Sequence, residues 1–316
     1  MKRLRIASRK SRLALWQAEH VQAQLQKLYP DLSIDILALS TEGDRVLDRA
    51  LYEIGGKGLF TKELEVALLR GEADIAVHSL KDVPMTLAEP FCLAVITERE
   101  DARDAWISAK VPRLEDLAQG AVVGTSSLRR EAQLKAYRPD LKIQPLRGNL
   151  DTRLGKLDKG EFAGILLAAA GLKRLALSER IAQYCDTALM LPAVGQAALA
   201  VECLREHSDV IALLQPLNHR PTLLAVSAER ELALRLGGSC RVPLAAYASI
   251  EGQQMLLRAC MQDQHGRLLH AAQAGEVSDL AEAVALGGRV AAKLTEQGAL
   301  PWPGLQTTPW VNAPSF

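Results

Sequence analysis

The sequence predicts an α/β protein made of two similar hinged α/β lobes and a small α+β C-terminal domain. Strand and helix patterns alternate through the first two thirds of the 316 residues, which is typical of largely parallel sheets covered by helices. A segment at 191–196 then breaks the periodicity. After a long helix at 220–236 the chain carries short strands and one last helix. A chain of this length also exceeds the size of one ordinary hydrophobic core.

The first lobe begins with a strand at 4–7 and then Ser11, whose hydroxyl suits the N-cap of the helix that follows. Apolar residues recur with the helical period through 13–28. Further elements are expected, in chain order, at 34–36 (strand), 60–69 (helix, ended by Gly71) and 74–78 (strand). In the second lobe we expect strands at 121–124, 142–145 and 164–168, each followed by a helix. The C-terminal domain is predicted from a helix at 220–236, strands at 244–250, 255–259 and 268–272, and a helix at 281–296.

These elements predict three domains. We place the first at 1–97 with a return segment at 198–216, the second at 102–191 and the C-terminal domain at 220–316. Two crossings, near 98–101 and 191–196, would join the lobes and leave a hinged cleft between them.

The composition argues against several function classes. Lys and Arg number 38 and Asp and Glu 37, so a general binder of nucleic acid or of anionic membranes is not expected. No apolar run is long enough to span a bilayer, and the N-terminal residues lack the apolar stretch of a secretion signal. The five cysteines are scattered and the six histidines isolated. We therefore predict reduced thiols, a cytoplasmic location and no metal.

Positive charge is concentrated between residues 125 and 160, where nine Lys or Arg face four Asp or Glu. Four of the arginines fall at or just after predicted strand ends: Arg129, Arg130, Arg147 and Arg153. Arginine binds a carboxylate through two parallel hydrogen bonds, which makes this region a candidate carboxylate site. The hydroxyls and backbone N–H groups of Thr125-Ser126-Ser127, at a helix start, form a second candidate anion site. The alternative is a solvated helix face, which accounts for about half of such charge runs.

Three loops carry further candidate residues. Asp82, beside Lys81, is either an ordinary cap or turn residue or an ionised carboxylate placed to take protons and stabilise a cation. Cys240 lies in a glycine-rich loop before an arginine, where a reactive thiolate is favoured. Core packing is expected instead for Cys92, Cys203 and Cys260. The glycine-rich segment at 55–58 lacks the residues of a phosphate-binding loop and is either a loop over the cleft or an ordinary turn.

Together these segments resemble the porphobilinogen deaminase (hydroxymethylbilane synthase) family of tetrapyrrole biosynthesis. The resemblance covers about the first 245 residues well and the remainder loosely. The matching motifs are RIASR at 5–9, GGKGLF at 55–60, ADIAVHSLKDVP at 73–84, GTSSLRR at 124–130, LRGN at 146–149, AGLKRL at 170–175, LPAVGQ at 191–196 and the Cys240 loop.

The resemblance implies a transferase that joins four porphobilinogen units head to tail, each losing ammonia, to give the linear tetrapyrrole hydroxymethylbilane of heme biosynthesis. It implies one dipyrromethane cofactor per chain, held by a thioether to Cys240 in the C-terminal domain, and a role for Asp82 in stabilising positive charge on pyrrole nitrogens. The chain would act as a monomer, with porphobilinogen as its small-molecule partner and with no nucleic acid or membrane partner. The predicted ligands of cofactor and substrate carboxylates are Arg9, Ser11, Lys57, Ser79, Lys81, Thr125, Ser127, Arg129, Arg130, Arg147, Arg153, Arg174 and Gln196.

Some positions depart from the usual family pattern. Arg12 stands where proline is common, Glu53 where lysine is frequent, and Ala197 where glycine is frequent. Gly237-Gly238-Ser239 replaces Glu-Gly-Gly before the cysteine. The anchoring cysteine itself is retained.

Two other function classes are alternatives to this resemblance. A non-catalytic two-lobed binder of a polycarboxylate, like periplasmic binding proteins or the sensor domains of transcription regulators, would share the lobes and the arginines. It would need no reactive cysteine. An acyl- or phosphoryl-transfer enzyme is disfavoured because the sequence lacks a nucleophile elbow and a P-loop.

Overall fold

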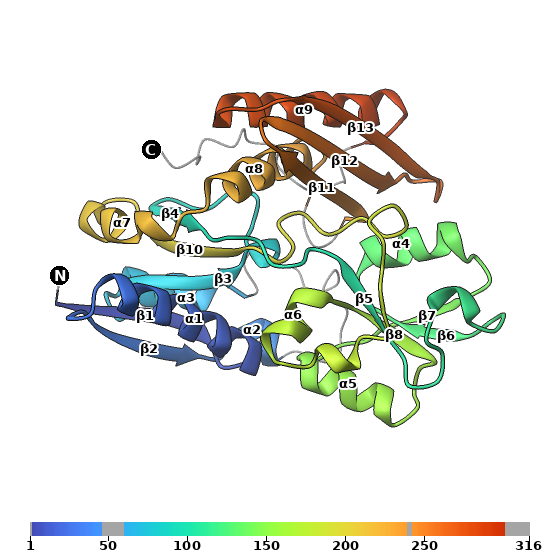
Figure 1. Cartoon of the computed structure of the whole chain (residues 1–316), viewed down its shortest axis with the longest axis horizontal. Helices are drawn as coiled ribbons and strands as arrows, with labels where there is room; N and C mark the ends of the chain where they lie inside the picture. The colour runs from blue at the N-terminus through green and yellow to red at the C-terminus, as the bar shows by residue number, and fades with distance from the viewer. Residues whose placement is uncertain (1, 46–59, 239–241, 301–316) are drawn as a thin grey trace.

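The computed structural model describes residues 2–45, 60–238 and 242–300, which form two five-stranded sheets and one three-stranded sheet, each with its own helices (Figure 1). The two five-stranded sheets form separate lobes, and the third sheet with its helices lies across the top of both in this view. No helix among these residues has the length and apolar character needed to cross a membrane.

The sheet of the first lobe has the strand order β2-β1-β3-β10-β4. Strands β2, β1 and β3 are parallel, and β10 runs antiparallel to both β3 and β4. The strands are β1 (Arg3–Arg9), β2 (Ser33–Leu39), β3 (Ile75–Ser79), β4 (Phe91–Ile96) and β10 (Leu199–Leu204). The helices are α1 (Arg12–Leu28), α2 (Glu42–Arg45), α3 (Lys62–Leu69) and α7 (Ser208–Leu214), with 3₁₀ turns η1 (Leu80–Asp82) and η4 (Gln215–Leu217).

Helix α1 begins where the sequence predicts. The Ser11 hydroxyl accepts a hydrogen bond from the Ala14 N–H, which satisfies one of the open backbone donors of the first turn. Ala18, Val21 and Leu25 then form a buried stripe that packs on the sheet. This packing holds the start of α1 close to the carboxyl end of β1.

The second lobe repeats this topology, with the strand order β7-β6-β8-β5-β9. Three parallel strands are followed by one antiparallel strand and an edge strand, as in the first lobe. In each lobe the antiparallel strand, β10 or β5, is the one that enters from the other lobe. The strands are β5 (Asp104–Ile107), β6 (Val122–Gly124), β7 (Lys142–Gln144), β8 (Gly164–Ala168) and β9 (Gln183–Tyr184). The helices are α4 (Leu128–Tyr137), α5 (Leu150–Asp158) and α6 (Ala169–Arg174), with 3₁₀ turns η2 (Leu114–Asp116) and η3 (Ser178–Arg180).

The C-terminal region is an antiparallel three-stranded sheet covered by two helices. Its elements are α8 (Arg220–Arg235), β11 (Leu244–Glu251), β12 (Gln254–Gln262), β13 (Leu268–Glu276) and α9 (Leu280–Glu296). Helices α8 and α9 approach closely at Gly287, where a Cβ atom would lie 2.4 Å from the Ala228 carbonyl oxygen. Only glycine fits this crossing.

Glu229 of α8 joins all three parts of the molecule. Its carboxylate is fully buried and forms an ion pair with Arg99 of the first crossing at 2.6 Å. It also accepts hydrogen bonds from the Gly195 N–H of the second crossing (2.8 Å) and from the Ala248 N–H of β11 (2.9 Å). The two segments that connect the lobes are therefore attached at one point to the C-terminal region.

The predicted architecture is confirmed, and the predicted strands and helices occur within a few residues of their expected bounds. Strands β4 and β10 are the main elements that the pattern does not predict. Each is an apolar run buried along its whole length, so it lacks the alternation that identifies a strand. Strand β10 lies within the predicted return segment 198–216 and belongs to the first sheet. The domain boundaries themselves stay predictions.

Candidate active site

A cavity of about 470 Å³ lies between the two lobes. The first lobe lines it with the end of β1, the first turn of α1, and the junction of β3 with η1. The second lobe lines it with the end of β8, the first turn of α5, and α6. The cavity therefore lies beyond the carboxyl ends of parallel strands, where α/β sheets usually bind ligands.

The described residues that line this cavity carry a large excess of positive charge. Eight are cationic and two are acidic, Asp82 and Asp151. The cap residues Ser11 and Asn149 place the starts of α1 and α5 at the cavity wall, which adds the partial positive charge of two helix N-termini. The cationic residues are Arg9, Lys10, Arg12, Lys81, Arg130, Arg147, Arg153 and Arg174. Such a lining suits a ligand with several carboxylates.

The loop that carries Lys81 and Asp82 is fixed by its apolar neighbours. Leu80 is fully buried, and its N–H donates to the Ala198 carbonyl at 3.0 Å. Gly195 lies directly against it with a φ of +68°, and a Cβ atom there would sit 2.8 Å from the Leu80 side chain. Val83 is buried on the other side of the loop. Because Leu80 and Val83 face inward, Lys81 and Asp82 are held at the cavity wall.

Lys81 and Asp82 interact through their charges. Burial lowers the pKa of Lys81 to about 8, Asp82 partly opposes this shift, and Arg130 adds to it. Within the described part of the chain, the Asp82 carboxylate accepts no hydrogen bond. A carboxylate in a cation-lined cavity that accepts no hydrogen bond from the described residues is available to a ligand that bears positive charge or N–H donors.

Two further arginines are held in place by backbone carbonyls. Arg153 Nε donates to the Gly148 carbonyl at 2.9 Å, and Arg174 Nη2 donates to the Ala197 carbonyl at 2.6 Å. Burial lowers the pKa of each to about 10, and for Arg153 neighbouring Arg130 lowers it further. Both remain charged at neutral pH. A carboxylate ligand would relieve the repulsion between these groups, so binding gains free energy from it.

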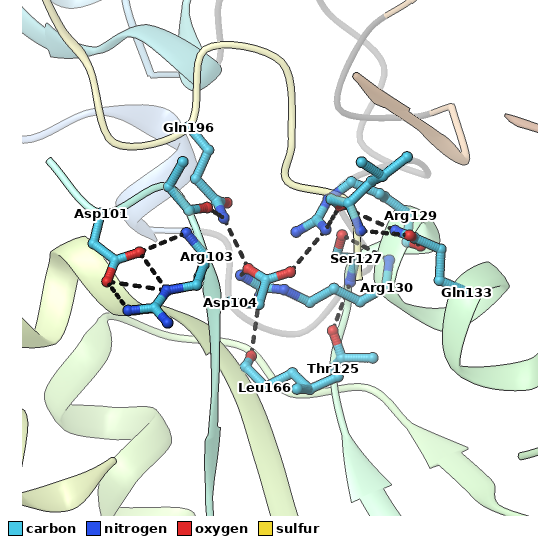
Figure 2. A network of polar contacts seen from close by, with 12 residues as sticks. Asp101, Arg103, Asp104, Thr125, Ser127, Arg129, Arg130, Gln133, Leu166 and Gln196 are labelled. Atoms are coloured by element: carbon cyan, nitrogen blue, oxygen red, sulfur yellow. Dashed lines mark hydrogen bonds and ion pairs between the residues drawn. The ribbon is translucent and has the colours of Figure 1, made fainter. Parts of the chain in front are cut away.

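Arg129 and Arg130 converge on one buried carboxylate (Figure 2). Asp104, at the start of β5, forms ion pairs with Arg129 Nη1 at 2.7 Å and with Arg130 Nη2 at 2.8 Å. Gln196 Nε2 donates to the same carboxylate at 2.9 Å. Burial acts to raise the pKa of Asp104, but the two guanidiniums outweigh it and hold that pKa below its usual range. Of these residues, only Arg130 lines the cavity.

The structure does not bring every predicted carboxylate ligand to the cavity. Thr125, Ser127, Arg129 and Gln196 are absent from its lining. The Ser127 hydroxyl caps α4 by accepting from the Arg130 N–H, and the Thr125 hydroxyl accepts from the Ser127 N–H. Arg129 also donates to the Leu191 carbonyl at 2.6 Å. These four side chains have intramolecular partners, and a role for them in binding carboxylates stays a prediction.

The other predicted ligands lie together. The cavity lining includes Arg9, Ser11, Ser79, Lys81, Asp82, Arg130, Arg147, Arg153 and Arg174. Lys57, Glu53 and Cys240 lie outside the described residues. A residue that the sequence does not single out is Gln17, a buried amide on α1 that lines the cavity and donates to the Ser79 hydroxyl at 2.8 Å. The sequence signal for Gln17 is a polar residue at a position where the helical period of 13–28 predicts a buried apolar one.

Ala197 takes a backbone conformation that suits glycine. Its φ is 75°, in the left-handed region, and its carbonyl accepts the Arg174 hydrogen bond. An L-residue with a side chain is strained there. The departure from the family pattern at this position therefore leaves the loop in a glycine-like conformation at some cost in stability.

Comparison with known proteins decides the assignment. A family model described as "Porphobilinogen deaminase, dipyromethane cofactor binding domain" matches residues 4–212, and one described as "Porphobilinogen deaminase, C-terminal domain" matches 223–296. The chain belongs to the porphobilinogen deaminase family. It is 54% identical over 301 residues to the porphobilinogen deaminase of Chromobacterium violaceum, covering 95% of this chain and 97% of that one. It is 57% identical over 299 residues to that of Ralstonia nicotianae, covering 94% and 90%.

Membership of the porphobilinogen deaminase family confirms the predicted function class over a non-catalytic binder. The chain is an enzyme of the transferase class in tetrapyrrole biosynthesis, and its first family domain is the one that binds the dipyrromethane cofactor. The aliphatic sulphonate binding protein SsuA of Escherichia coli covers 96% of the chain at a TM-score of 0.43 and 17% identity, covering 89% of its own length. A likeness this weak adds nothing to the assignment.

Proposed function

We propose that this chain condenses four porphobilinogen molecules head to tail, each losing ammonia, to give hydroxymethylbilane, and that Asp82 is its catalytic carboxylate. The observation that carries the proposal is the position of Asp82 in a cavity between the lobes whose lining has eight cationic side chains. Porphobilinogen carries two carboxylates and a cationic aminomethyl group. The cationic side chains can pair with its carboxylates, and Asp82 can pair with its aminomethyl group.

The residues of the cavity also fit a dipyrromethane. Two pyrroles with an acetate and a propionate each carry four carboxylates, and the lining offers enough cations for these and for an incoming substrate. Arg9, Arg130, Arg147, Arg153 and Arg174 would hold the carboxylates. When bound, the dipyrromethane supplies the primer to which pyrrole units are added.

Asp82 then has two tasks in the proposed reaction. Its carboxylate holds the N–H of a pyrrole and offsets the positive charge that develops as ammonia leaves and as the new carbon–carbon bond forms. Lys81, beside it, provides a further cation for a substrate carboxylate. The buried Leu80 and Val83 fix both side chains, so little reorganisation is needed during turnover.

Cys240 is the proposed attachment point. The other four cysteines, Cys92, Cys185, Cys203 and Cys260, are buried in the described structure. Burial raises the pKa of Cys185 and of Cys260 to about 12, which disfavours the thiolate that a thioether-forming step requires. These four described cysteines are free thiols, which also supports the proposed cytoplasmic location.

We also propose that the chain acts as a monomer. Large apolar side chains that are exposed in the described structure are few and lie on separate elements: Leu28, Leu69, Tyr137, Leu256 and Leu300. Such scattered residues do not form the contiguous apolar patch of a stable interface.

Intact-mass measurement tests the attachment. The purified protein should exceed its sequence mass by two condensed pyrrole units, and Cys240→Ser should have the bare mass and no turnover. Cys260→Ser is the matched control, because it removes a thiol from the buried set and should keep the added mass. An unmodified wild type with full turnover, or added mass on Cys240→Ser, would contradict the proposal.

A further inference from the structure

Arg12 is a cation of the cavity that none of the roles described above uses. It is the first residue of α1, lines the cavity, and has a side chain that is 58% exposed. A residue that both lines the cavity and faces solvent lies at the edge where a ligand enters.

The stability of α1 does not explain a cation at this position. The N-terminus of a helix carries partial positive charge, so arginine in the first turn is repelled by it. Its role must therefore come from what its guanidinium contacts. Arg12 Nη1 lies 3.3 Å from Asp151 Oδ1, and Nη2 lies 3.5 Å from the Leu175 carbonyl oxygen. Both partners belong to the second lobe, so this side chain reaches across the entrance of the cavity.

The contact with Asp151 is easily exchanged. It is long for an ion pair, and the Asp151 side chain is 49% exposed. Solvent and salt screen such pairs strongly. Asp151 also lies in the first turn of α5, where the helix N-terminus stabilises a carboxylate without help from Arg12. A second carboxylate can therefore replace Asp151 at low cost to either residue.

We propose that Arg12 is a further substrate-binding residue, which leaves Asp151 and pairs with a carboxylate of the incoming porphobilinogen at the entrance of the cavity. Asp151 then competes with the substrate carboxylate for the Arg12 guanidinium and holds that guanidinium in position between turnovers. This inference rests on the proposed substrate. It assigns opposite effects to the two members of one ion pair, which a purely structural contact between the lobes would not produce.

The test is steady-state kinetics of the cofactor-loaded enzyme with porphobilinogen. Arg12→Gln should raise KM about two- to fivefold with kcat within twofold of wild type, the size expected for an exposed carboxylate contact. Asp151→Asn should lower KM by about twofold, because Arg12 no longer has a competing anion. In the double variant KM should equal that of Arg12→Gln. Arg12→Lys should have a KM between those of wild type and Arg12→Gln, because lysine keeps the charge but not the two-pronged geometry. Added salt should reduce the difference in KM between wild type and Arg12→Gln.

The pair of Arg180 and Asp158 provides matched controls. Asp158 also belongs to α5, and its contact with Arg180, at 2.5 Å, lies outside the cavity lining. Arg180→Gln and Asp158→Asn should leave KM unchanged. The unfolding midpoint of Arg12→Gln should not fall, since the change removes an unfavourable charge from the start of α1.

Two results would overturn the inference. If Arg12→Gln and Asp151→Asn shift KM in the same direction, the pair only holds the lobes together. The second is that Asp151→Asn lowers KM by the same factor in the Arg12→Gln variant as in the wild type. Asp151 would then act through the electrostatic potential of the whole cavity and not through Arg12. Wild type that carries the cofactor mass but does not turn over porphobilinogen would instead refute the proposed function and the inference with it.

Discussion

Asp104→Asn should strongly destabilise the protein, because Asp104 is the counterion of two buried guanidiniums. The substitution keeps the shape of the side chain and removes its charge. Arg129 and Arg130 are each about 5% exposed and lie 2.7 and 2.8 Å from the carboxylate. Removing one partner of a buried ion pair typically costs about 3–5 kcal/mol. The asparagine oxygen can still accept one of the hydrogen bonds, so we expect a loss of about 3–4 kcal/mol.

Urea unfolding measures this loss directly. With a slope of about 2 kcal/mol per molar urea, the unfolding midpoint of Asp104→Asn should fall by about 1.5–2 M. Asp158→Asn is the control, since its side chain is 55% exposed in a surface ion pair and should cost at most about 1 kcal/mol. Equal midpoints for the two variants would refute the idea that Asp104 neutralises the arginines.

The pH dependence gives a second, independent readout. The pKa of Asp104 is depressed in the folded protein, so its stabilisation is complete above the unfolded value, near 3.8, and is lost as the pH falls toward the folded value. The difference in stability between wild type and Asp104→Asn should therefore stay constant from pH 7 to 5 and narrow below about pH 4. A difference that already narrows between pH 7 and 5 would contradict the assignment.

Three further predictions concern the cavity. Asp82→Asn should reduce turnover by about 10²–10³ with an unchanged unfolding midpoint, and a loss below tenfold would exclude the catalytic role. Lys81 has a pKa lowered to about 8, so KM for porphobilinogen should rise between pH 7 and 9 as the charge of Lys81 is lost. KM should rise less in Lys81→Arg, because arginine stays charged over this range. Parallel pH profiles of KM for the two proteins would contradict this role of Lys81. Ala197→Gly should stabilise the protein by about 0.5–1 kcal/mol in urea unfolding, because its φ of 75° suits glycine, and no gain would mean that the loop carries little strain.

The sequence predicts those parts of the fold whose signals are local. The cap at Ser11, the amphipathic period of α1 and the short strands before α9 depend on neighbouring residues, and all are found in the structure. Strands β4 and β10 pair with each other over more than a hundred residues of sequence separation and are buried throughout. Nothing local distinguishes such apolar runs from buried helix, so only tertiary pairing defines them.

The same distinction applies to the site. Lys81 and Asp82 follow the end of β3 and Arg147 follows the end of β7, and the position of strand ends in an α/β lobe is enough to predict that they line the cavity. Arg129 likewise follows the end of a strand, β6, but it contacts Asp104, which is 25 residues away in sequence. Gln196, in the crossing between the lobes, contacts the same carboxylate from 92 residues away. A charged residue near a strand end can serve a ligand or a buried partner, and its own neighbours in sequence do not decide which.

The cations of the cavity differ in how firmly they are held, and the difference follows their exposure. Arg130 is buried, and its two terminal nitrogens donate to Asp104 and to the Leu166 carbonyl, so its orientation is set before any ligand enters. Such a preorganised group loses little rotamer freedom on binding and suits a ligand that stays in place. Arg12, at the entrance, is exposed and held by a weak ion pair. An enzyme that retains its primer through several additions needs fixed cations for the part that stays and exchangeable cations for each unit that arrives, and the cavity provides both kinds.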